Sequence, residues 1–328
     1  MPSVGSNAQM GFGEETLWAS GTITISKFIP FISEGLQLTK NVVMTESIRG
    51  SSAHSIHQEG ANRVGGDIQV EVQPVGMWTL FKHALGRRFT AGPSGSGFYH
   101  HRILPSGALP EGLRLEVGRD SGGTFTYKGI KVNTLEMTCA VGDPLRATFG
   151  LLGYDETASA SAPTAVTSMS AVSPYNFDQA VVYIDGVAAA TTVEVSGFTL
   201  NINNNLAEDK GKLGSKYRAA IPRNGFREVT GTLNVEFDNL YNYNRFINQT
   251  EHAVQIRFTH NEMAAGSTAH QLDIVLPRVV FTGETPTASG PDLIYHDLPF
   301  IALFDPSEGN DQEQDEVRLQ VITSDATI

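Results

Sequence analysis

Cysteine is nearly missing from the sequence: one residue, Cys139, occurs among 328. One cysteine can form neither an intrachain disulfide nor a cysteine-based metal site, and its place in an alternating apolar strand indicates a small core residue. No stretch approaches the ~20 apolar residues of a membrane span. No basic segment leads into an apolar run near the start, as a signal peptide would require. We therefore expect a protein made in a cytoplasm, with no membrane segment and no secretion signal.

Basic residues are also scarce, with 23 Lys and Arg against 35 Asp and Glu and a net charge of -12. Tight nucleic-acid binding needs cations that displace phosphate counterions, so this balance argues against a protein that wraps DNA. What the sequence does contain is strand-forming: 33 glycines, with frequent Thr, Val and Ser, favour strands and turns over helices. The length suits one large domain or two ordinary ones.

The segment DIQVEVQ (67–73) has the clearest period of two. Its apolar residues point to one side, and Asp67, Gln69 and Glu71 point to the other. Pro74 ends this pattern and can open a helix. Trp78 and Phe81 then fall on one helical face. The segment therefore predicts an amphipathic strand followed by a short helix.

A second stretch, EVTGTLNVEFDNLYNYNRFI (228–247), repeats this pattern, with Gly231 in the place of Gly66. EGLQLTKN (34–41) similarly resembles SGFTLNIN (196–203), which aligns Gly35 with Gly197. Any two amphipathic strands look somewhat alike, and that explanation stays open. Against it, four features recur in the same order: strand, long loop, alternating strand and short helix. The second copy places Thr232, Asn234 and Glu236 on its polar face, and Tyr243 and Phe246 on its helix.

These patterns predict a mainly β protein of two tandem domains. The small, nearly chargeless segment around 157–171 is typical of a linker. It separates residues 1–156 from a second copy at 172–305, and an acidic arm at 306–328 follows. Each copy is expected to be a β-sandwich or barrel with one short flanking helix and one long polar loop, at 40–66 and 204–230.

Four features in order, GFGEETLWASGT, FIPFISEGLQL, the long loop and GGDIQVEVQPVGMWTLFKHALG, resemble the tail tube (major tail) proteins of long-tailed bacteriophages. The resemblance is strongest over residues 11–86. It implies a structural virion protein whose subunits form stacked rings, with a continuous β-barrel around the lumen. It also implies that the long loops and terminal arms join adjacent rings.

Carried over by position, the resemblance implies that strands 34–39, 67–72, 196–201 and 232–237 line the lumen. Their acidic groups would repel phosphates, so DNA would slide during ejection without binding tightly. The expected lumen residues are Gln37, Asp67, Gln69, Glu71, Thr199, Asn201, Thr232, Asn234 and Glu236. Basic residues of the two long loops are candidates for contacts between rings, the alternative being solvated loop charges. These are Arg49, Arg63, Lys210, Lys212, Lys216, Arg218, Arg223 and Arg227.

Many tubes of this kind are sixfold with one tube domain per subunit, so two domains per chain predict a homotrimeric, pseudo-hexameric ring. If the duplication is illusory, the ring would be a hexamer. The resemblance further implies four kinds of partner besides further copies of this chain. A tape measure protein and DNA would occupy the lumen, and tail terminator and distal tail proteins would cap the tube.

Enzymatic readings find little support. The pair His100–His101 lacks a third metal ligand, GRDSGG (118–123) lacks the context of a serine protease, and GKLGSK (211–216) has the wrong spacing for a phosphate loop. We expect no catalytic residue, no metal and no cofactor. The alternative function is an all-β carbohydrate- or receptor-binding module. It predicts an exposed Trp and Tyr cluster, and the positions of Trp18 and Trp78 argue against it.

Overall fold

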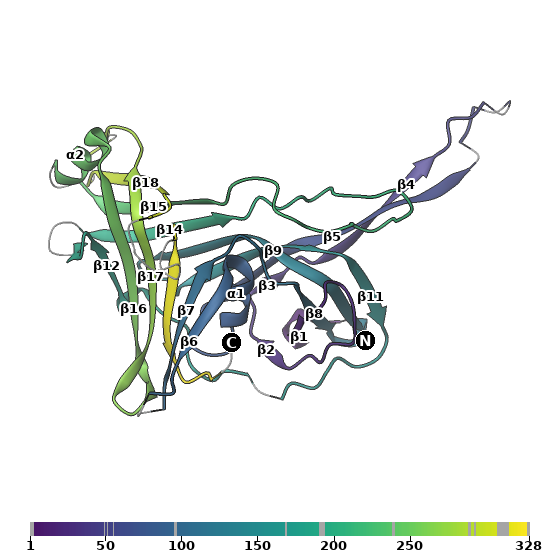
Figure 1. Cartoon of the computed structure of the whole chain (residues 1–328), viewed down its shortest axis with the longest axis horizontal. Helices are drawn as coiled ribbons and strands as arrows, with labels where there is room; N and C mark the ends of the chain where they lie inside the picture. Colours follow the sequence, from purple (N-terminus) through teal and green to yellow (C-terminus); the bar gives the residue numbers. More distant parts are fainter. Residues whose placement is uncertain are drawn as a thin grey trace.

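The computed structural model describes residues 3–326 except 49, 51, 55, 95–96, 168, 190–193, 238–239, 288–289, 292 and 307–314 (Figure 1). The described part is mainly β, and its two α-helices are α1 (Trp78–Leu85) and α2 (Tyr241–Asn248). The mainly β class predicted from the sequence is confirmed.

Seven strands form the central sheet, in the order β4, β5, β10, β9, β14, β15, β18, and every pair is antiparallel. One face of these strands is apolar and fully buried, as Ile68, Val70 and Leu233 illustrate. Period-two alternation therefore places the other side chains together on the opposite face. The strands are β4 (Gln37–Met44), β5 (His57–Glu71), β10 (Arg146–Gly153), β9 (Thr124–Ala140), β14 (Val195–Asn203), β15 (Glu228–Glu236) and β18 (Tyr295–Ala302).

Two outer sets of strands continue from the central sheet. One continues through the long strand β9, and the other through β17 (Thr268–Phe281), whose end at Val279–Phe281 pairs with β18. The first set is β2–β1–β8–β9–β11 and the second is β6–β7–β19–β17–β16–β12–β13. Side chains from both sets join one contiguous core with the central sheet. The further strands are β1 (Ala8–Glu15), β2 (Lys27–Ile29), β3 (Ser33–Glu34), β6 (Gly86–Ala91), β7 (Tyr99–Pro105), β8 (Gly112–Arg119), β11 (Asp155–Ser159), β12 (Ala180–Ile184), β13 (Val187–Ala188), β16 (Glu251–Ala265) and β19 (Arg318–Thr323).

The pairing order of the first half recurs in the second. β1 pairs with β8, β8 with β9 and β9 with β11, while β12 pairs with β16, β16 with β17 and β17 with β19. In the central sheet, the order β4–β5–β10–β9 is matched by β14–β15–β18–β17. The hairpin β6–β7 is extra, and β7 pairs with β19 of the second half.

The two helices occupy equivalent places in chain order but pack differently. Trp78 and Phe81 of α1 are fully buried, and the Trp78 indole donates to the Pro74 carbonyl at 2.7 Å. In α2, Tyr243 and Phe246 are half-buried with ring centroids 6.1 Å apart. The second helix therefore contributes less apolar burial than the first.

The polar stretches predicted as loops contain more structure than their composition suggests. Much of 40–66 is the extended hairpin of β4 and β5, so a loop assignment for the whole stretch is wrong. This arm projects from the body, and the segment 204–227 runs beside it (Figure 1). The Asn62 amide donates to the Lys216 carbonyl at 2.8 Å, and Lys216 is 2.6 Å from Glu59. Pairing between the two strands satisfies the backbone hydrogen-bonding groups of this polar segment, which has few apolar side chains to bury.

The two glycines that align the repeat have no room for a side chain. A Cβ at Gly66, where φ is +145°, would lie 2.1 Å from the Gly35 carbonyl oxygen. At Gly231 it would lie 2.4 Å from the Phe300 ring and 2.5 Å from the Thr199 carbonyl. Both positions therefore require glycine.

Alanine at Gly66 or at Gly231 is expected to lower the free energy of unfolding by about 2 kcal/mol, because each site must shift to admit the methyl group. Alanine at Gly107, where a Cβ would meet no atom within 4 Å, is the matched control and should change stability little. Urea unfolding of the three variants measures this. Equal stability of all three would contradict the steric explanation.

Candidate functional site: the polar face of the central sheet

The polar face of the central sheet brings together side chains from β5, β10, β9, β14, β15 and β18. The cross-strand registers place Gln69 opposite Thr148, Thr148 opposite Glu136, and Glu136 opposite Asn201. A neighbouring row runs through Glu71, Arg146, Thr138, Thr199 and Thr232. Residues predicted from separate segments thus lie on one continuous surface.

All nine residues predicted to line the lumen lie on strands of the central sheet, in the alternating phase that carries the polar face. Strand parity places Asp67, Gln69 and Glu71 together on β5, and Thr232, Asn234 and Glu236 together on β15. Gln37 lies on β4, while Thr199 and Asn201 lie on β14. The Asn234 amide donates to Asp297 on β18 at 2.6 Å.

Three acidic residues of this face, Glu136, Glu228 and Asp297, were not predicted from the sequence, and all three are exposed. Period-two alternation along β15 extends to Glu228, and alternation along LEMTCA and YHDLPF identifies Glu136 and Asp297 once those strands are placed beside β10 and β15. Arg146 is the basic residue among the rows, and it lies 3.1 Å from Asp143. The face is therefore predominantly acidic.

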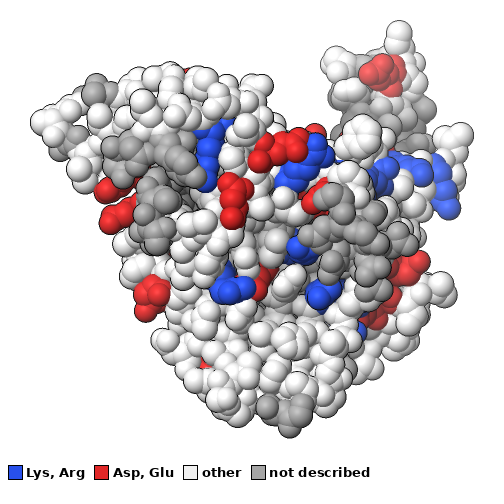
Figure 2. Space-filling model, turned by 60° about the vertical axis from the view of Figure 1, so that its left-hand side comes forward, with Lys and Arg blue, Asp and Glu red and all other residues white. Residues whose placement is uncertain are grey.

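The basic residues of the two long loops mostly contact their own chain. The Arg218 guanidinium is buried and donates to the carbonyls of Val64, Gly153 and Glu208 at 2.6–2.9 Å. Arg63 is 3.8 Å from Asp209. Lys210 and Lys212 are exposed, and Arg49 lies outside the described residues. Figure 2 shows acidic and basic side chains intermixed on one face of the molecule, with no large area of one sign.

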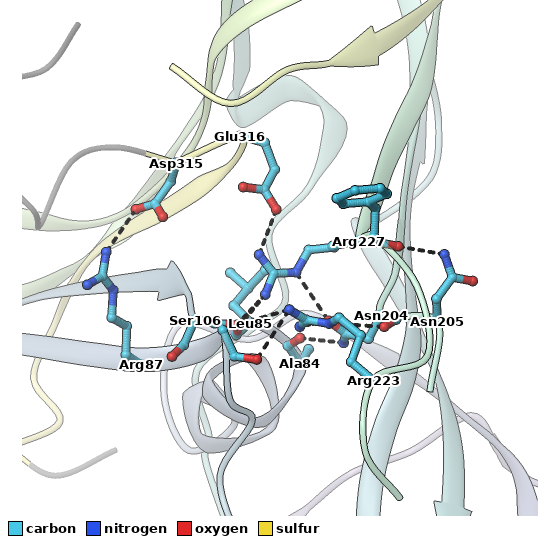
Figure 3. A network of polar contacts seen from close by, with 12 residues as sticks. Ala84, Leu85, Arg87, Ser106, Asn204, Asn205, Arg223, Arg227, Asp315 and Glu316 are labelled. Atoms are coloured by element: carbon cyan, nitrogen blue, oxygen red, sulfur yellow. Dashed lines mark hydrogen bonds and ion pairs between the residues drawn. The ribbon is translucent and has the colours of Figure 1, made fainter. Parts of the chain in front are cut away.

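Arg223 and Arg227 are half-buried and belong to a polar network that also includes Asn204 (Figure 3). Asn204, 1% exposed, is its centre: its amide nitrogen donates to the carbonyls of Ala84 and Val132 at 2.7 and 3.1 Å. Its side-chain oxygen accepts from Arg223 and Arg227 at 3.1 and 3.2 Å. The network joins the long loop of the second half to helix α1.

The network also holds the C-terminal segment, because Arg227 donates to Glu316 at 2.6 Å and to the Ser106 carbonyl at 2.7 Å. The neighbouring Asp315 is buried and lies 3.5 Å from Arg87. Burial raises the pKa of Asp315 to about 6, against the lowering effect of Arg87. The fold therefore favours the protonated carboxyl.

Because the pKa of Asp315 is higher folded than unfolded, its contribution to stability is most favourable below pH ~4 and is lost as pH rises to about 6. We expect Asp315→Asn to lose this dependence, and to gain stability relative to the parent protein at pH 7.5 but not at pH 4. Thermal melting at both values measures this. A constant difference between variant and parent across that range would contradict the assignment.

Two other titratable residues, Glu14 and His101, make hydrogen bonds that hold parts of the fold together. Burial alone would raise the pKa of Glu14, but hydrogen bonds from His83 and Lys82 hold it at about 2, which ties β1 to helix α1. His101 is buried, its pKa is lowered by burial, and one ring nitrogen lies 2.8 Å from the Asp325 carbonyl. Within the described residues, no three His, Cys, Asp or Glu side chains are grouped so that they could hold a metal ion.

The fold and this face define a mainly β protein built around a sheet with one apolar and one predominantly acidic face. Residues 5–302 match the model of the family described as phage tail tube protein, so the chain belongs to that family. It is a structural component of the virion tail. Comparison with curated proteins found no match. None of the helices in the described ranges is long and apolar enough to cross a membrane.

Proposed function

We propose that this chain assembles into rings that stack as the tail tube, with the polar face of the central sheet as the lumen wall. The acidic character of that face is the observation that carries the proposal. An open sheet with one buried and one solvated face can close into a barrel by pairing its edges with those of neighbouring copies. Closure would turn the acidic faces of all copies inward.

DNA in such a lumen meets Asp67, Glu71, Glu136 and Glu236 with few cations between them. Phosphates are repelled by these carboxylates, and binding through counterion release needs lysines or arginines that the face largely lacks. DNA therefore passes without being held. The same wall would surround a tape measure protein before ejection, and terminator and distal tail proteins would meet the two ends of the tube.

We further propose that residues 1–156 and 172–305 are two tube domains, with 157–171 as linker and 306–328 as a C-terminal arm whose strand β19 pairs with β17 of the second domain. The recurring pairing order of the strands supports this duplication. Three chains then supply six domains, which gives a homotrimeric ring with pseudo-sixfold symmetry.

Contacts between rings are assigned to the arm of β4 and β5 and to the loop 204–227. The arm exposes Val42, Val43 and Met44, which are 57%, 51% and 51% exposed. Exposed apolar side chains grouped on a projecting hairpin are typical of an interaction surface. Lys210 and Lys212 in the adjacent loop are free to meet acidic groups of the next ring.

The alternative, a binding module for carbohydrate or a receptor, is less well supported. Trp78 is fully buried, and Trp18 packs edge-to-face on Tyr154 while its indole donates to the Gly129 carbonyl at 3.0 Å. Both tryptophans therefore serve packing in this chain.

Electron microscopy of the purified protein tests the proposal. We expect rings or tubes with a central hole, and a ring mass of three chains. Monomers at high concentration would contradict assembly, and a six-chain ring would contradict two tube domains per chain.

A further inference from the structure

The junction between the two halves of the chain is a strand pair with a defined register. β9 of the first half pairs with β14 of the second, from Gly197 opposite Ala140 to Asn203 opposite Thr134. Glu136 lies opposite Asn201 in this pair. If the two halves are equivalent, the same pair must recur between the second half of one copy and the first half of the next.

The counterpart of β14 in the first half is β4, and strand registers fix the correspondence. Gln37 is opposite Gly65, and Asn201 is opposite Thr230, which occupies the place of Gly65 when Gly231 is aligned with Gly66. Gln37 therefore occupies the place of Asn201. This structural equivalence of β4 and β14 differs by two residues from the sequence alignment of Gly35 with Gly197. Because the shift is an even number of residues, the same side chains stay on the same face.

The counterpart of the second half of β9 is the segment that follows β17. Leu151 is opposite Val132, as Phe300 is opposite Phe281. At the preceding residue of β10, Gly150 is opposite Thr134. At the corresponding place in the second half, the Thr282 amide donates to the Pro299 carbonyl at 2.7 Å. Thr282 thus occupies the place of Thr134, and Glu284 occupies that of Glu136.

We propose that residues 36–39 of one copy pair antiparallel with 282–285 of the next, with Gln37 opposite Glu284 and Leu38 opposite Gly283. The inference rests on the proposed ring and specifies which edges close it. Two segments of the chain that are 243 or more residues apart thereby become neighbours across each joint.

The hydrogen-bonding phase of both edges agrees with this register. The Gly35 amide donates to Asp67 of β5, so the backbone groups of Leu38, three residues on, point away from β5. Thr282 bonds to β18, so the groups of Gly283 point away from β18. The described strand pairings show β4 joined to β5 alone. Leu38 and Gly283 are thus presented at open edges.

An internal contact limits how far the pairing extends. The Leu36 carbonyl accepts hydrogen bonds from Arg119 at 2.9 Å and from the Tyr127 hydroxyl at 3.0 Å. The Leu36 amide donates to Glu34. These contacts occupy the edge beside Leu36, so Leu38 carries the backbone hydrogen bonds of the joint.

The side chains also suit this pairing. Gln37 and Glu284 are both exposed, and the register puts both on the polar face, where Gln37 lies opposite Gly65 of β5. Glu284 then adds a further carboxylate to the proposed lumen at each joint. An amide opposite a carboxylate provides a neutral hydrogen-bond partner where two acids would repel.

Disulfide cross-linking of assembled rings tests the register. Gln37 and Glu284 would form a non-hydrogen-bonded pair with Cα atoms about 4.5 Å apart, close enough for a disulfide. In a Cys139→Ser background, Q37C combined with E284C should give covalent dimers and trimers in most chains after mild oxidation. T39C with E284C, two residues out of register, should cross-link at least about tenfold less.

The pair T39C and T282C also fits the proposed register. It provides an independent cross-linking test if Q37C combined with E284C impairs assembly. Rings that fail to cross-link through either matched pair, or that cross-link equally through the offset pair, would overturn the register while the ring itself stands. Absence of rings from the parent protein in electron micrographs would overturn the ring proposal, and this pairing with it.

Discussion

Phage carrying lysine in place of both Glu136 and Glu236 are expected to assemble normal tails and to lose infectivity by about 100-fold or more. Both side chains lie on the polar face and project away from the core, so their replacement should change stability by less than ~0.5 kcal/mol each. A three-chain ring would then present six new lysines to the lumen. Six cations in contact with phosphates suffice for strong, salt-dependent binding, which would hold DNA in transit.

Plaque counts per particle, with tail length from electron micrographs, measure this effect. The matched variant with glutamine at both positions removes the acids without adding cations, so it should lose much less infectivity. Lysine at Glu111, exposed and outside the polar face, should lose none. Full infectivity of the lysine variant in particles with normal tails would rule out this face as the lumen wall.

The sequence predicted the parts of the structure that local pattern determines. Period-two alternation at 67–73 and 232–237 identified two central strands and their polar side chains, because one buried face fixes the orientation of every residue in a strand. The short helix after each strand followed from apolar spacing in the same way. Resemblance of the ordered segments supplied the family, which the match over residues 5–302 confirms.

What the sequence did not predict depends on contacts between distant segments. Glu136 and Asp297 join the polar face only because β9 and β18 lie beside β10 and β15. The alternation within each strand gave their orientation, but not their neighbours. Likewise, a list of loop arginines contains no sign that Arg218 would be buried against the carbonyls of Val64 and Gly153.

The role of Asn204 was also invisible in the sequence, yet its replacement by alanine is expected to cost roughly 3 kcal/mol of folding free energy. The side chain makes four hydrogen bonds in a buried site, to two carbonyls and two guanidinium groups. Alanine would leave the Ala84 and Val132 carbonyls without this donor, and each buried polar group left unsatisfied costs about 1–3 kcal/mol. Urea unfolding measures the change.

Asn201→Ala is the matched control: the same substitution on the solvated polar face should cost less than ~0.5 kcal/mol. Equal effects at both positions would contradict a special role for the network. A double-mutant cycle with Arg227→Ala sharpens the test, because residues that share hydrogen bonds show non-additive costs. We expect a coupling of about 1 kcal/mol or more between Asn204 and Arg227, and none between Asn201 and Arg227. Coupling of this kind means that the long loop of the second half and helix α1 of the first are stabilised together.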